Sequence, residues 1–170
     1  METIEDTLRR LKQQREMLLM RVALLGDLRQ RVPPNSKTWS PLQIVDHLTR
    51  AEAEYLRFIE EGEKQGVARR RPSRSPMIPI LVWLMRKRIS VPTIPSMVPS
   101  ADPRSFAELK SEWDSVRISL IEKLSGSDPK IPVVLNPILG PMNAEQTVRL
   151  IEAHVDYHMA QIPAPEAVSG

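Results

Sequence analysis

Hydrophobic positions recur at helical spacing in four long segments of the chain. The first segment runs from about residue 4 to 31, where leucines repeat every three or four positions and polar residues fill the other face. The others run from about residue 41 to 64, from 102 to 124, and from 143 to 162. No strand pattern is convincing, because the short run 133–135 is too brief to count. The pattern predicts an all-α protein of four long helices.

Start signals precede the last three of these helices. Ser40 is a good N-cap, and Gln43 three residues later completes a capping box. Asn143 and Gln146 repeat this arrangement before the last helix. Asp102, followed by a proline at the first helical position, predicts the start of the third helix.

The segment between the second and third helices is long and rich in proline. Seven of the chain's 16 prolines lie between Pro72 and Pro103, so only a short helix around residues 80–89 fits there. Helix–helix links in bundles usually have about 2 to 8 residues, and this one is much longer. A crossover between two helices that run in the same direction explains the length. We therefore expect an up-down-down-up four-helix bundle with a short extra helix in the crossover.

Length and composition fit one domain, residues 1–163, followed by a flexible tail, residues 164–170. Cysteine is absent, which excludes disulfides and thiolate metal ligands. The first residues mix acids and bases and do not resemble a secretory signal. The longest apolar run, residues 77–85, has nine residues, whereas a membrane span needs about 20. These features predict a cytoplasmic protein.

The net charge of +3 hides a segregated distribution of charges. Residues 64–100 contain eight Lys and Arg and no acid, whereas the remainder carries 16 basic and 21 acidic groups. The sequence leaves three interpretations of this basic segment open. It is a solvated loop without a specific partner, an amphipathic helix that binds a membrane surface, or a site where Arg70, Arg71 and Arg74 bind an anionic cosubstrate. The few aromatic residues form no stacking platform, which argues against a nucleic-acid partner.

All three histidines of the chain lie at positions that could close one metal site. His154 and His158 are four residues apart, so both rings lie on one helical face. His47 lies seven residues after its N-cap, about 10 Å into its helix. If its helix and the last helix are antiparallel, the three rings share a level. Three imidazoles leave coordination positions of the metal open, as a catalytic metal requires. The pair lacks the glutamate that follows the first histidine in the zincin motif, so the site is not of the zincin type.

Two polar residues could support these rings. Gln161 lies three residues after His158 and could orient an imidazole or hold a water, and Glu54, seven residues after His47, could accept an imidazole N–H. The simpler interpretation, which we favour for both, is an exposed polar residue on a helix. Asp46 is expected to point away from the histidines and into solvent.

Two stretches of the chain, residues 39–48 and residues 136–162, resemble the DinB/YfiT-like family. The first contains Trp39-Ser-Pro-Leu-Gln and His47, and the second contains His154 and His158 in the pattern His-Val-Asp-Tyr-His. The resemblance is weakest across the basic segment. It implies an up-down-down-up bundle, often a homodimer, whose three histidines bind a divalent metal ion.

The resemblance also implies an activity, because characterised relatives include enzymes that transfer low-molecular-weight thiols or isomerise with them. We therefore expect a metal-dependent enzyme that conjugates a thiol to an electrophilic small molecule. A metal-dependent hydrolase is the alternative within the enzyme class. A non-catalytic bundle that binds a partner or a membrane through its basic segment is the alternative outside it. Imidazole suits Zn, Ni, Fe and Cu, so the identity of the metal stays open.

Overall fold

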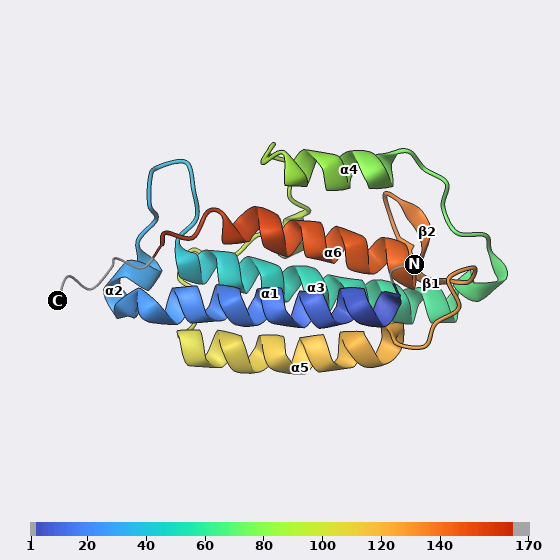
Figure 1. Ribbon diagram of the computed structural model, residues 1–170, viewed down its shortest axis with the longest axis horizontal. Helices are drawn as coiled ribbons and strands as arrows, with labels where there is room; N and C mark the ends of the chain where they lie inside the picture. The colour runs from blue at the N-terminus through green and yellow to red at the C-terminus, as the bar shows by residue number, and fades with distance from the viewer. Residues whose placement is uncertain (1–2, 165–170) are drawn as a thin grey trace.

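The computed structural model describes residues 3–164, which are mainly helical (Figure 1). A two-stranded antiparallel sheet and two 3-10 turns, Val67–Arg69 and Pro95–Met97, complete the secondary structure of this part of the chain. The elements are α1 (Ile4–Leu24), α2 (Gly26–Arg31), α3 (Pro41–Lys64), α4 (Met77–Arg86), α5 (Phe106–Leu124), β1 (Pro132–Asn136), β2 (Gly140–Asn143) and α6 (Ala144–Met159).

Four long helices, α1, α3, α5 and α6, lie side by side along the length of the molecule (Figure 1). Helices α3 and α5 run in one direction and α1 and α6 in the other, which is the order that the long crossover led us to expect. Helix α3 packs against α5, and α1 packs against α6. The short helix α4 lies on the outer side of α6, away from α5. The start of α3 and the end of α6 therefore lie at the same end of the bundle.

The start signals predict two helices correctly and misplace a third. The capping boxes of α3, at Ser40, and of α6, at Asn143, are confirmed. Helix α5, however, begins after Ser105 and not after Asp102. The Ser105 side chain accepts from the backbone N–H of Glu108 at 3.3 Å, and the Glu108 carboxylate accepts from the backbone N–H of Ser105 at 3.0 Å. This reciprocal pair is a stronger start signal than an aspartate followed by proline.

The first predicted helix, residues 4–31, is divided in two. Gly26 adopts a positive φ of 73°, which interrupts the α-helical hydrogen bonds and separates α1 from α2. The Gln30 side chain on α2 donates to the carbonyl of Val22 on α1 at 3.1 Å. This bond holds the short second helix against the end of the first.

The all-α expectation needs a correction, because a β-hairpin precedes α6. Strands β1 and β2 pair antiparallel across a turn in which the Asn136 side chain accepts from the backbone N–H groups of Ile138 and Leu139, both at 2.9 Å. Gly140 closes the turn with a φ of 80°. The strands are short and interrupted by prolines, so the sequence pattern hid them.

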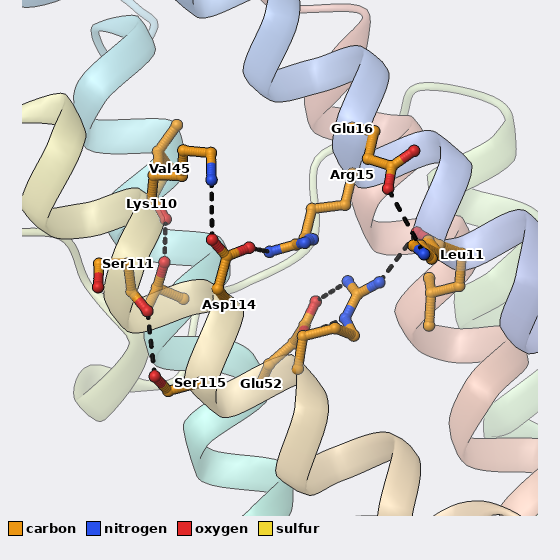
Figure 2. Close-up of polar contacts among 12 residues, drawn as sticks. Leu11, Arg15, Glu16, Val45, Glu52, Lys110, Ser111, Asp114 and Ser115 are labelled. Carbon is orange, nitrogen blue, oxygen red and sulfur yellow. Dashed lines mark hydrogen bonds and ion pairs between the residues drawn. The ribbon is translucent and has the colours of Figure 1, made fainter.

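A buried polar network crosses the core between α1, α3 and α5 (Figure 2). Arg117 and Glu52 form a bidentate ion pair in which each side chain is only 2% exposed. The Arg117 guanidinium also donates to the carbonyl of Leu11 at 2.9 Å. Nearby, Asp114 accepts a hydrogen bond from Arg15. The network fixes the position of α3, which carries His47, relative to its neighbours.

Among residues 3–164, no helix is both long enough and apolar enough to cross a membrane. The tail predicted for residues 164–170 lies outside the described residues except for Ala164.

Candidate metal centre

The three histidines meet between α3 and α6. The Nε2 atoms of His47 and His154 are 2.9 Å apart, and one nitrogen of each of the three rings lies within 4.8 Å of the others. The antiparallel arrangement of α3 and α6 brings His47, early in its helix, to the level of His154 and His158, late in theirs. These are the three residues that the sequence places at one level.

Two of the rings are oriented by hydrogen bonds at Nδ1. The Nδ1 atom of His47 lies 2.6 Å from the carbonyl oxygen of Met97, and that of His158 lies 2.8 Å from Oε1 of Gln161. A carbonyl oxygen only accepts, so Nδ1 of each ring carries the proton. The Nε2 atom of each ring is then unprotonated and can bind an ion. Gln161 thus contacts a site histidine, in a position where it orients the ring.

The loop that carries Met97 is attached to α3 by Asp46. The Asp46 carboxylate accepts from the backbone N–H of Ser100 at 2.7 Å and is itself only 2% exposed. Our expectation that Asp46 faces solvent is therefore wrong, because this loop covers it. By fixing the loop, Asp46 places the Met97 carbonyl against the ring of His47.

All three histidines are held in the neutral form. Burial lowers the pKa of His47, although the Met97 carbonyl and the charge of Asp46 oppose the shift. Burial, aided by the neighbouring His47, lowers the pKa of His158 to about 3. Burial and the two neighbouring rings hold the pKa of His154 well below its ordinary value. At neutral pH the nitrogen lone pairs are therefore not blocked by protons.

The donor set fits a divalent metal ion. In a tetrahedral site with metal–nitrogen bonds of about 2.0–2.1 Å, two nitrogen ligands are about 3.3 Å apart. The separation of 2.9 Å between His47 and His154, and the limit of 4.8 Å for the whole set, bracket this value. Three neutral nitrogen donors, two of them oriented through their second nitrogen, are also the arrangement typical of histidine metal sites. The three histidines could therefore hold a metal ion.

A cavity of about 470 Å³ opens onto the histidines. One wall consists of Met77, Leu81 and Met85, which repeat every four residues along α4. The ring of Trp39 lies against His47 and His158, with ring centroids 4.7 and 5.8 Å apart. Most of the remaining lining is also apolar. Lys37 is the only charged side chain among the described residues that line this cavity, and none of them is Asp or Glu.

The other predicted site residues do not meet the histidines. The Glu54 carboxylate accepts from Arg57 at 2.8 Å, within its own helix, and not from an imidazole N–H, the role that its spacing from His47 made possible. The arginines of the basic segment, Arg70, Arg71 and Arg74, are exposed, and none lines the histidine cavity. Arg74 instead lines a second cavity, beside the opposite face of α4. The positions of these arginines therefore do not support the prediction that they bind an anionic cosubstrate at the metal.

Sequence reasoning missed several groups around the site. The Met97 carbonyl and the Asp46 anchor depend on the path of a loop, for which the sequence carries no local signal. The spacing of Met77, Leu81 and Met85 is a signal that could have been used, since residues four apart share one helical face.

A helical bundle with three neutral histidines between antiparallel helices defines the class: a helical protein with a site that could hold a metal ion. The family model of the DinB superfamily matches residues 10–162, and the chain belongs to this superfamily. The matched region contains all three histidines and the crossover with α4. No curated protein and no solved structure matches the chain.

Proposed function

We propose that this protein is a divalent-metal-dependent enzyme that transfers a low-molecular-weight thiol to an electrophilic small molecule. The observation that carries the proposal is the convergence of three neutral histidine nitrogens in the lining of a largely apolar cavity. Membership of the DinB superfamily, which comprises metal-binding proteins, supports it. His47, His154 and His158 would hold the ion, with Zn, Ni or Fe as candidates. When bound, the ion supplies the charge that lowers the pKa of a thiol and stabilises the thiolate.

The surrounding residues would position the reactants and exclude water. Met97 and Gln161 fix two of the imidazole rings. Burial, with the nearby charge of Glu52, raises the pKa of Tyr55 to about 12, so its phenol on the cavity wall stays protonated and can donate a hydrogen bond. Lys37 is suited to pair with an anionic group on the thiol. The apolar remainder of the lining favours an electrophile with little charge.

The lining of the cavity favours thiol transfer over hydrolysis. A hydrolase moves a proton to its leaving group, commonly through a carboxylate or histidine that acts as general acid and base. Within residues 3–164 no Asp or Glu lines the cavity, and the only histidines there are the three candidate ligands. A thiol that has lost its proton to solvent can displace a halide from carbon: the C–S bond replaces the carbon–halogen bond, and the halide leaves as an anion that needs no proton donor.

A conjugation assay tests the proposal. Protein loaded with Zn²⁺, Ni²⁺ or Fe²⁺ is incubated with a panel of small thiols and an uncharged alkyl halide or epoxide, and the thioether product is measured by mass. We expect metal-dependent product formation that falls at least about a hundredfold in His154→Ala. Glu54→Gln, which alters a residue that does not contact the histidines, is the matched control and should keep its activity. Ester hydrolysis that proceeds without any thiol would favour the hydrolase instead.

A further inference from the structure

Helix α4 exposes an apolar ridge on the face that points away from the bundle. Ile80 is 43% exposed and Trp83 is 54% exposed, whereas Ile78 and Met85, on the side of α4 that faces the bundle, are buried. Helix α4 is the outermost helix on its side of the molecule (Figure 1). A large aromatic side chain left in water beside a second apolar one is a feature of surfaces that bind a partner or a membrane.

The chain segment that contains the ridge carries charges of one sign. The segment from residue 64 to 100 carries eight Lys and Arg and no acid. Four of these lie next to the ridge in the chain: Arg74 before α4, and Arg86, Lys87 and Arg88 at its end. Arg88 pairs with Asp156 at 3.2 Å and so ties the end of α4 to α6. Neither Arg74 nor Arg86 has an ion-pair partner within residues 3–164, so both guanidinium groups are available to an external anion.

The second cavity connects the ridge with these free arginines. It has a volume of about 720 Å³ and lies between α4 and the first half of α6. Pro79, Val82 and Trp83 form an apolar wall, and Arg74 and Arg86 line the same cavity. The one acid in the lining, Glu152, is paired with Arg10 at 2.8 Å. A cavity that combines an apolar wall with unpaired guanidinium groups suits an anion that carries a hydrocarbon part. The phosphate headgroup of a lipid has this chemistry.

We propose that α4 and the second cavity dock the protein on an anionic lipid membrane. Trp83 and Ile80 lie in the interfacial region of the bilayer, and Arg74 and Arg86 bind lipid phosphates. Charge complementarity favours an anionic membrane as the binding partner, because a basic segment without acids is attracted to an anionic surface. The opposite face of α4 lines the histidine cavity, so docking brings that cavity close to apolar molecules dissolved in the lipid.

Vesicle sedimentation of the full chain tests the docking. We expect binding to vesicles of phosphatidylcholine with phosphatidylserine, and at least tenfold weaker binding to vesicles of phosphatidylcholine alone. The double variant Arg74→Gln/Arg86→Gln should weaken binding to the anionic vesicles about thirtyfold. Trp83→Ser should weaken binding to the anionic vesicles about tenfold, since it removes the aromatic anchor.

Matched controls lie on α5, on the opposite side of the bundle (Figure 1). Arg104→Gln, just before α5, and Ile118→Ser, at a position 59% exposed, should bind the anionic vesicles like the unaltered protein. Variants of the histidine site should also keep their vesicle binding, so that failure of the docking and failure of the metal site are distinguishable.

Three results would overturn the docking. The first is absence of binding to the anionic vesicles. The second is an equal loss of binding in the α5 controls. The third is displacement of the protein from vesicles by inorganic phosphate at constant ionic strength, which would assign the second cavity to a free anion.

Discussion

A backbone carbonyl, and not a side chain, orients the ring of His47. The carbonyl of Met97 reaches Nδ1 because the loop that carries it is fixed to α3 through the Asp46 carboxylate and the backbone N–H of Ser100. Asp46 is therefore a positioning residue: it acts on the candidate ligand through the loop.

Replacement of Asp46 by alanine should weaken metal binding. The loop loses its bond to Asp46 and keeps only the bond from the Gln43 side chain to the Ser100 carbonyl, so the Met97 carbonyl fixes the His47 ring less well. We expect the Kd for Zn²⁺ to rise about 10- to 100-fold, the range typical of such supporting partners. Competition with a chelator measures this Kd. Asp156→Ala is the matched control, because Asp156 is half exposed and pairs with Arg88 instead. Equal Kd values for the two variants would argue against a role for the loop.

Metal-free protein should lose stability as the pH falls. The pKa of His158 is about 3 in the folded chain, and a histidine in an unfolded chain has a pKa of about 6.5. Between these values the unfolded chain binds a proton that the folded chain excludes, so the free energy of unfolding decreases as the pH drops below about 6.5, by up to about 1.4 kcal/mol per pH unit for each such histidine.

Urea unfolding of the metal-free protein between about pH 7.5 and about pH 5 measures this loss. In His158→Gln the dependence on pH should be shallower, because one of the three excluded protons no longer contributes. A free energy of unfolding that stays constant over this range would contradict the assignment of buried, neutral histidines.

At the scale of the elements, the buried pair of Glu52 and Arg117 joins α3 to α5 and, through the carbonyl of Leu11, to α1. Arg117→Ala leaves the Glu52 carboxylate buried without a partner, which should cost about 3–5 kcal/mol of stability. The double variant Glu52→Leu/Arg117→Met should recover much of this loss, because it removes both buried charges.

Chemical denaturation measures both variants. Arg104→Ala is the matched control: it removes an exposed ion pair with Glu112 and should change stability by less than about 1 kcal/mol. A loss in Arg117→Ala that is no larger than the loss in Arg104→Ala would show that the pair does not fasten the helices.

The elements also show which features a sequence can reveal. The starts of α3 and α6 were predictable because a capping box is a contact between residues three apart. The hairpin before α6 was missed because its strands are short and contain prolines, and the break at Gly26 because a single glycine is tolerated within a helical pattern. The start of α5 was missed although Ser105 and Glu108 also form a capping box that the sequence contains.

The histidine cluster lies between these two cases. Helix geometry and the direction of the crossover place the three rings at one level, and the structure brings them together. The groups that surround the histidines were harder to predict from the sequence, because their positions depend on the path of the crossover. These groups are the Met97 carbonyl, the Asp46 carboxylate that holds the loop, and the exposed side chains of Arg70, Arg71 and Arg74.

At the scale of the whole molecule, the bundle brings the candidate ligands together and the crossover encloses them. An ion that binds only the folded chain stabilises the molecule by mass action. At a free metal concentration about a hundred times the Kd, the gain is about 2.7 kcal/mol, which for a chain of 170 residues raises Tm by roughly 5–10 °C.

Thermal unfolding before and after removal of metal by a chelator measures this shift in Tm. His154→Ala should show no shift when metal is added, because it removes one of the three nitrogen donors. A similar rise in Tm for this variant would place the stabilising ion elsewhere.

The most direct measurement is the metal content of the untagged protein, purified without chelator and then equilibrated with Zn²⁺. The three-histidine site predicts about one divalent ion per chain, retained in Glu54→Gln and lost in His154→Ala and in His158→Gln. A folded protein that takes up no ion, or histidine variants that bind as much metal as the unaltered chain, would contradict the site.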